Sequence, residues 1–86
     1  MASALQNLSS GKVHKKIEYA DAVVAIVTAE WNAQITEALQ QGAFETLREA
    51  GFKKENIKII KVPGTVELTF AAKLFCQKPE VQGVIV

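Results

Sequence analysis

Residues that could bind a polar ligand are concentrated in residues 62–68, which read Val-Pro-Gly-Thr-Val-Glu-Leu. Pro63 fixes the backbone angle φ and Gly64 permits a sharp bend or the close approach of another group, so a turn is predicted here. We expect Thr65 to cap a following helix through its hydroxyl. Glu67 would then lie in the first turn, where the helix dipole favours an ionised carboxylate that accepts hydrogen bonds from a ligand.

The same pattern has an interpretation that needs no ligand. Many helices begin with a hydroxyl-bearing residue followed by an acidic residue that pairs with the positive end of the dipole. Taken alone, Thr65 and Glu67 predict only a helix start. A binding role for them therefore depends on the elements that surround the segment.

A second candidate segment, residues 29–32, also follows an apolar strand. Residues 22–28 read Ala-Val-Val-Ala-Ile-Val-Thr, and a continuous β-branched run of this kind is typical of a strand covered on both faces. Trp31 lies in the turn that follows. Asn32 is predicted to be the N-cap of a helix that runs to about Ala50 and ends at Gly51.

The remaining elements follow from the apolar periodicity. The first helix should pack on the core through positions that recur every fourth residue, flanked by small residues: Ile35, Leu39, Ala43 and Leu47, with Ala38, Gly42 and Ala50. A second strand is predicted over residues 57–62. A second helix is predicted over residues 66–77, ending before Pro79 and burying Leu68, Ala71, Ala72 and Phe75. A third strand should begin within residues 81–86.

This order, β-α-β-α-β, predicts an α/β fold with a parallel sheet and helices packed on its faces. Ligands of such sheets bind beyond the carboxyl ends of the strands, so Trp31 and Glu67 should face one crevice if their strands are neighbours. Three strands and two helices would leave one face of the sheet bare. We therefore expect residues 21–86 to be the amino-terminal part of a longer domain.

Composition excludes several classes of protein. The 86 residues carry a net charge of +1 and are 49% hydrophobic, which argues for one small globular domain and against a nucleic-acid-binding protein. No run is long enough to cross a membrane and no leader pattern is present, so we expect a cytoplasmic protein. No Cys/His cluster has metal-ligand spacing, and Cys76 is predicted to be a small buried apolar residue.

Residues 1–20 are predicted to form an amino-terminal arm rather than part of the domain. Residues 13–19 combine apolar side chains with lysines and could form a short edge strand whose charges prevent unwanted pairing. His14 lies among these lysines and is predicted to be solvated.

The order and spacing of several motifs resemble the amino-terminal half of lumazine synthase. The match covers residues 21–86 and is carried most strongly by an aromatic-Asn pair followed by Val-Pro-Gly-x-x-Glu. The motifs are Glu30-Trp31-Asn32, Gln41-Gly42-Ala43, Ile60-Lys61-Val62-Pro63-Gly64-Thr65-Val66-Glu67-Leu68 and Ala71-Ala72-Lys73. The resemblance implies a flavodoxin-like three-layer α/β fold, of which the β-α-β-α-β portion is present and the carboxy-terminal half is missing.

The family resemblance also implies a reaction. Lumazine synthases join 5-amino-6-ribitylaminouracil to 3,4-dihydroxy-2-butanone 4-phosphate through an imine, release phosphate and close the ring of 6,7-dimethyl-8-ribityllumazine, in riboflavin biosynthesis. They use no metal or organic cofactor, and they assemble as pentamers or as sixty-subunit shells. The partners implied for this chain are the two substrates and other copies of itself.

The resemblance also implies roles for individual residues at positions that match the family's motifs. Trp31 matches the aromatic residue that stacks on the pyrimidine ring, and Asn32 is a family-like position whose predicted role is to cap the helix. Thr65, Val66 and Glu67 match the segment that contacts the ribityl chain and ring edge after the Pro63-Gly64 turn. The family's catalytic histidine, phosphate-binding helix start and later Arg and Lys have no match here, since His14 belongs to the arm. The chain alone should therefore bind pyrimidine poorly and make no product.

Two alternatives remain open at this point. The chain could be a non-catalytic assembly module, in which the arm adds a strand to the sheet of an adjacent subunit. It could also be half of an unrelated flavodoxin-like or nucleotide-binding domain. The second alternative is not favoured, because no Gly-x-Gly-x-x-Gly or Gly-x-x-x-x-Gly-Lys follows a strand.

Overall fold

A computed structural model describes residues 21–86. Three strands form a parallel sheet in the order β2-β1-β3. The elements along the chain are β1 (Val24–Ala29), α2 (Ala33–Ala50), the short 3-10 helix η1 (Lys54–Asn56), β2 (Ile57–Val62), α3 (Thr65–Cys76) and β3 (Gly83–Ile85). The predicted α/β class and the β-α-β-α-β order are confirmed. The first strand begins and ends later than predicted, and the third is short.

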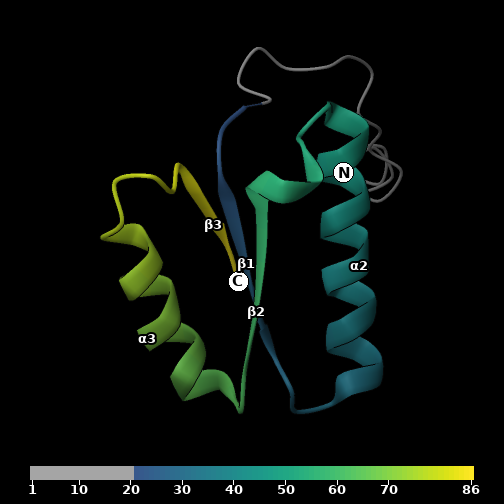
Figure 1. Cartoon of the computed structure of the whole chain (residues 1–86). Helices are drawn as coiled ribbons and strands as arrows, with labels where there is room; N and C mark the ends of the chain where they lie inside the picture. Colours follow the sequence, from purple (N-terminus) through teal and green to yellow (C-terminus); the bar gives the residue numbers. More distant parts are fainter. Residues whose placement is uncertain (1–20) are drawn as a thin grey trace, which may run out of the picture.

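The two helices lie on opposite faces of the sheet, which gives three layers (Figure 1). Both helices contact β1, and α3 also contacts β2 and β3. The prediction that two helices would leave one face bare was therefore wrong. The chain crosses from β1 to β2 on one side and then back over β1 to β3 on the other. Because both crossovers have the same hand, the two connecting helices lie on different faces of the sheet.

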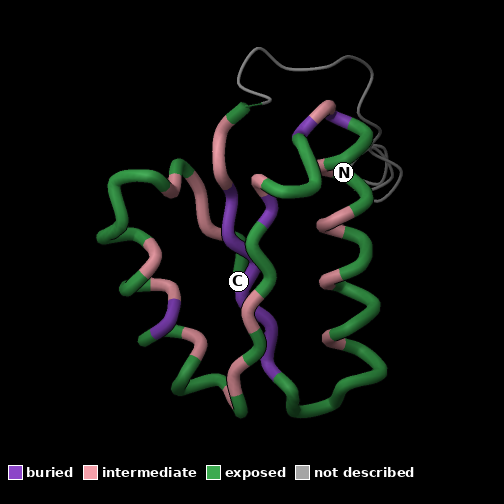
Figure 2. The backbone as a smooth tube through the Cα atoms, in the orientation of Figure 1, coloured by how far each residue is buried: buried purple, intermediate pink, exposed green. Residues whose placement is uncertain are grey.

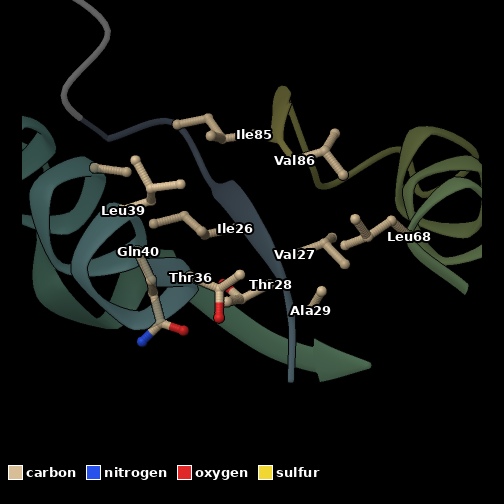
Figure 3. Close-up of a pocket in the computed structure, with 11 residues that line it drawn as sticks. Ile26, Val27, Thr28, Ala29, Thr36, Leu39, Gln40, Leu68, Ile85 and Val86 are labelled. Atoms are coloured by element: carbon tan, nitrogen blue, oxygen red, sulfur yellow. The ribbon is translucent and has the colours of Figure 1, made fainter. Parts of the chain in front are cut away.

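The central strand β1 is buried along its whole length, as its continuous apolar sequence predicted (Figure 2). Successive side chains point to opposite faces. Val24 and Ile26 face α2 and form a core cluster with Ala50, Phe52 and Ile57. In Figure 3, Ile26 and Thr28 lie on the side of α2, whereas Val27 and Ala29 lie on the side of α3. This alternation lets six consecutive residues fill both layers.

Helix α2 begins and ends close to the predicted residues, but one cap differs from the prediction. Asn32 occupies the N-cap position in the left-handed conformation, with φ 57° and ψ 52°, and its side chain makes no capping hydrogen bond. Its carbonyl instead accepts from the backbone N–H of Ile35 and of Thr36 at 2.9 and 3.0 Å. Gly51 ends the helix with φ 106°, a conformation that glycine adopts without strain.

The predicted inward face of α2 is confirmed in its second half, where Ala43, Leu47 and Ala50 belong to the core or pack against it, but not in its first half. Ile35 and Leu39 are 63% and 69% exposed, so their predicted packing on the core was wrong. The residues of α2 that are not exposed are Thr36, Gln40, Ala43, Phe44, Leu47 and Ala50, so Thr36 and Gln40 take the places predicted for Ile35 and Leu39. The two polar members of this set made the sequence pattern misleading, because apolar periodicity placed the face one residue away.

Of the side chains predicted to be buried in α3, Ala71 is buried and the other three are half-buried. Leu68, Ala71, Ala72 and Phe75 are the residues of α3 that are not exposed. The outer face is also apolar, since Val66, Phe70 and Leu74 are 78%, 66% and 45% exposed. Cys76, the last residue of α3, is exposed, so the prediction that it is buried was wrong.

Strand β2 lies at one edge of the sheet and is only partly covered. Ile57 is buried and Ile59 is 40% exposed.

An ion pair lies before the first residues of β1 and β2, where Lys53 Nζ is 2.9 Å from the Asp21 carboxylate. The hydrogen bond and the charge of Asp21 raise the pKa of Lys53. This exposed pair links the segment that precedes β1 to the loop that precedes β2.

The predictions for residues 1–20, including the arm, the edge strand and a solvated His14, lie outside the described residues. Among residues 21–86, neither helix combines the length and the apolar character that crossing a membrane requires.

Candidate functional site

The two candidate segments leave the sheet at the same edge. β1 and β2 are adjacent and parallel, and Ala29 pairs with Val62 at their carboxyl ends. The backbone N–H of Glu30 donates to the Val62 carbonyl at 2.7 Å, which extends the pairing into the loops. The loop before α2 and the loop before α3 therefore start side by side, at the lower end of the sheet in Figure 1.

The first loop carries Trp31 with most of its ring in solvent. Its side chain is 71% exposed, far more than an aromatic residue that packs in the core. Asn32, held in the left-handed conformation, reverses the chain between Trp31 and the first turn of α2. Asparagine tolerates this conformation better than most residues, so Asn32 sets the path of the loop rather than capping with its side chain.

The second loop is organised around Gly64 and the carboxylate of Glu67. Gly64 occupies the N-cap position of α3 with φ −156°, an extended conformation open to any residue. A Cβ at this position would lie 3.3 Å from Glu67 Oε1. The lack of a side chain at Gly64 therefore lets the Glu67 carboxylate lie close to the backbone of the turn.

Thr65 is the first residue of α3 and does not cap it, so the predicted capping role was wrong. The Gly64 carbonyl accepts from the backbone N–H of Leu68 at 3.2 Å. Thr65, Val66 and Glu67 are all exposed. Their backbone N–H groups lie in the first turn, where helix geometry leaves donors free for a ligand or for water.

The structure thus brings a flat aromatic face and an exposed carboxylate to one edge of the sheet. An aromatic ring can stack on a planar heterocycle, and a carboxylate can accept several hydroxyl donors. Two cavities border these loops in the described part of the chain, and neither is lined by Trp31 or Glu67. One, of about 260 Å³, lies between the helices (Figure 3), and the other, of about 180 Å³, lies beside Glu30 and Lys61.

Sequence analysis did not identify two polar features near this edge. Lys61 Nζ lies 3.0 Å from Glu37 Oε1 and joins β2 to α2 next to the first loop. Gln40 Oε1 is buried and has no hydrogen-bond partner among the described residues. The sequence carried one usable signal for Gln40: it lies four residues from Thr36 and three from Ala43 on the helix, which is the spacing of one face.

Comparison with known families decides the assignment. The family model described as 6,7-dimethyl-8-ribityllumazine synthase matches residues 21–86, which include both loops and all the described elements. The chain belongs to the 6,7-dimethyl-8-ribityllumazine synthase family. The predicted resemblance is confirmed over the same residues.

Individual members of the lumazine synthase family match almost the whole chain. A protein of that name from Parabacteroides distasonis is 45% identical over 86 residues, which are 100% of this chain and 54% of the relative. Relatives from Porphyromonas gingivalis and Cytophaga hutchinsonii are 42% and 44% identical over 99% of this chain and 53% of their own. The chain therefore spans about half the length of the lumazine synthases it matches.

Proposed function

We propose that the protein acts in riboflavin biosynthesis as a 6,7-dimethyl-8-ribityllumazine synthase. The reaction would condense 5-amino-6-ribitylaminouracil with 3,4-dihydroxy-2-butanone 4-phosphate, form an imine, release phosphate and close the lumazine ring. Family membership supports this reaction. The observation that carries it is this match over residues 21–86, and the Glu30 N–H to Val62 carbonyl bond of 2.7 Å adds that the two loops proposed to hold one substrate start side by side.

The pyrimidine substrate would bind across these two loops. The exposed indole of Trp31 would stack on the uracil ring, which exposes a flat face to dispersion and quadrupole contacts. The Glu67 carboxylate would accept hydroxyl donors of the ribityl chain, and backbone groups of Thr65 and Val66 would contact the ring edge. Charge assistance makes carboxylate–hydroxyl bonds stronger than neutral ones.

Three further residues would shape the site without reacting. Pro63 and Gly64 form the turn that leads from β2 into α3, and Gly64 leaves space for the Glu67 carboxylate. Asn32 holds the first loop in its left-handed bend. No residue of this chain is proposed as the proton-transfer catalyst, and no metal or organic cofactor is proposed.

The chain would supply the pyrimidine-recognising part of the enzyme. Because it spans about half of its relatives, we propose that phosphate binding and proton transfer depend on polypeptide beyond residues 21–86. Within the chain, residues 21–86 would form the α/β unit and residues 1–20 an arm. The 86 residues on their own would bind pyrimidine weakly and form no lumazine.

A chimeric enzyme tests this function. Residues 1–86 would replace the matched portion of the Parabacteroides distasonis relative, and the purified chimera would be mixed with both substrates while lumazine fluorescence and free phosphate are followed. The proposal predicts one phosphate released per lumazine formed. A folded chimera that forms no lumazine would overturn the function.

Self-assembly is the second candidate function, and two surfaces favour it. The outer face of α3 exposes Val66, Phe70 and Leu74 at helical spacing, and among residues 21–86 β2 has a strand partner on only one side. Exposed apolar faces and open strand edges are typical contact surfaces between copies. We propose a homo-oligomeric cytoplasmic protein, either a pentamer or a sixty-subunit shell. Sedimentation of the chimera tests this, and a monomer at micromolar concentration would contradict it.

A further inference from the structure

Lys61 and Val62, the last two residues of β2, contact the chain on both sides of the Trp31 loop. This loop, residues 30–32, joins the end of β1 to the start of α2 (Figure 1). At its start, the Val62 carbonyl accepts from the first backbone N–H of the loop at 2.7 Å. Beyond its end, Lys61 Nζ lies 3.0 Å from Oε1 of Glu37 on α2. Two consecutive residues of one strand therefore hold the chain before and after Trp31.

The position of Glu37 on α2 lets this ion pair act on the first turn of the helix. Glu37 lies four residues after Ala33, the first residue of α2, and residues at this spacing lie one above the other on a helix face. On β2, Lys61 shares a face with Ile57 because successive side chains alternate, and Ile57 belongs to the core cluster on the α2 side. The ion pair therefore fixes the start of α2 relative to the end of β2.

Apolar packing contributes little to the position of this part of α2. Residues 30–35 are all exposed, and Ile35, the large apolar residue of the first turn, is 63% exposed. Beside the loop is a cavity of about 180 Å³, lined by Ala29, Glu30, Ala33, Glu37 and Lys61. Close packing ordinarily determines how a helix lies on a sheet. Because the helix start and the strand ends leave a cavity between them, the ion pair takes a larger share in that role here.

The exposure of the ion pair limits what it adds to the stability of the fold. The side chains of Lys61 and Glu37 are 44% and 56% exposed, and exposed ion pairs stabilise folded proteins only slightly. Surface loops, however, change conformation at very small cost in free energy, so a weak link can still decide which conformation a loop adopts. Loss of the pair should therefore change the order of the Trp31 loop more than the stability of the fold.

We propose that Lys61 is a positioning residue of the pyrimidine site, which acts through Glu37 to hold the Trp31 loop in the conformation that presents the indole to the substrate. Pro63 and Gly64 follow β2 directly, so the strand end that holds the first loop also begins the second. A loop already held in its bound conformation loses less conformational entropy when the ligand binds. The pair should therefore raise the affinity for the pyrimidine, and this inference rests on the proposed function.

The order of the loop in the free chain is the first test. In isotope-labelled residues 1–86, the amide order parameter of Trp31 should fall from about 0.85 towards 0.6 in Lys61→Met, whereas Lys61→Arg, which keeps the charge, should preserve it. Lys58→Met is the matched control, because Lys58 is an exposed lysine of β2 on the opposite face of the strand. An unchanged order parameter in Lys61→Met, or an equal fall in Lys58→Met, would overturn the inference.

A double-mutant cycle in the chimera is the second test. Lys61→Met and Glu37→Gln should each raise the Kd for 5-amino-6-ribitylaminouracil about two- to fivefold, and the double variant should raise it no further. The exchanged pair, Lys61→Glu with Glu37→Lys, should recover most of the affinity because it restores the attraction between the two positions. The melting temperature should change little in any of these variants. Fully additive effects of the two single changes would contradict the coupling.

The positioning role and the proposed function can fail separately. A chimera that forms no lumazine counts against the function, and the order of Trp31 in the free chain then decides the role of Lys61. An active chimera in which Lys61→Met changes neither the order of Trp31 nor the Kd supports the function and overturns the positioning role. A loss of affinity while the order of Trp31 is unchanged would assign Lys61 a direct contact with the substrate, which also overturns that role.

Discussion

The backbone N–H of Glu30, the residue after β1, donates to the carbonyl of Val62, the last paired residue of β2, at 2.7 Å. This bond fixes the origin of two loops that are more than thirty positions apart in the sequence. Trp31 follows directly in one loop, and Pro63 follows directly in the other. The candidate site therefore depends on strand pairing rather than on any contact between the loop side chains.

Replacing Trp31 by Ala in the chimera should weaken binding of 5-amino-6-ribitylaminouracil. Loss of stacking on the order of 1–2 kcal/mol corresponds to roughly tenfold in Kd, and Trp31→Phe should recover part of it. Because the ring is 71% exposed, the free energy of unfolding should change little. Isothermal titration measures the affinity, and an unchanged Kd in Trp31→Ala would exclude a stacking role.

Replacing Glu67 by Gln in the chimera should reduce turnover without unfolding the protein. Gln has a similar shape but only one acceptor oxygen and no charge, so a hydrogen bond to a charged group is lost, about 1.5–3 kcal/mol. We expect kcat/KM to fall by roughly tenfold or more at an unchanged melting temperature. Equal activity at equal stability would remove Glu67 from the site.

Gly64→Ala tests whether Gly64 and Glu67 act together. The backbone of Gly64 is extended and accepts alanine, but the added Cβ would lie 3.3 Å from Glu67 Oε1 and should displace the carboxylate. Affinity for the pyrimidine should fall several-fold in the chimera, with a stability change below about 1 kcal/mol. In a Glu67→Gln background the same change should have a smaller effect. Fully additive effects would show that the two positions are independent.

The Lys53–Asp21 pair predicts a pH dependence at the alkaline end. Asp21 raises the pKa of Lys53 above the ordinary value of 10.5, so folding favours the protonated lysine. The stabilisation is complete below 10.5 and is lost as the pH rises through the raised pKa. Because the pair is exposed, the effect should be small. Denaturant unfolding between neutral and alkaline pH checks it, and Asp21→Asn should remove the dependence; an identical pH profile in both proteins would contradict the assignment.

Much of the fold could be predicted from the sequence because its signals are local. The β-branched run at β1, the glycine at position 51 and the proline at position 79 each act on their own neighbourhood, and the parallel order follows from alternation of strands and helices. The first half of the inward face of α2 could not be predicted in this way. Thr36 and Gln40 face inward, and only tertiary packing decides whether a polar residue occupies such a position.

The site was predictable to the level of loops but not of atoms. Sequence placed Trp31 and Glu67 at the carboxyl edge of the sheet, and strand pairing confirms that both loops start there. Asn32 occupies the predicted N-cap position of α2, but its left-handed backbone leaves the side chain without a capping hydrogen bond. The capping role of Thr65 was wrong, because Gly64 occupies the N-cap position of α3. Cap geometry depends on backbone angles that residue type alone does not determine.

The central claim is that both loops hold one pyrimidine substrate, and nuclear magnetic resonance tests it most directly. Isotope-labelled residues 1–86 would be titrated with 5-amino-6-ribitylaminouracil to millimolar concentration, where weak binding is still visible. Trp31 is the single tryptophan of the chain, so its indole N–H is an unambiguous probe. The account predicts that this signal and the amides of Val66 and Glu67 shift together with one dissociation constant. Shifts confined to one loop, or different constants for the two loops, would contradict it.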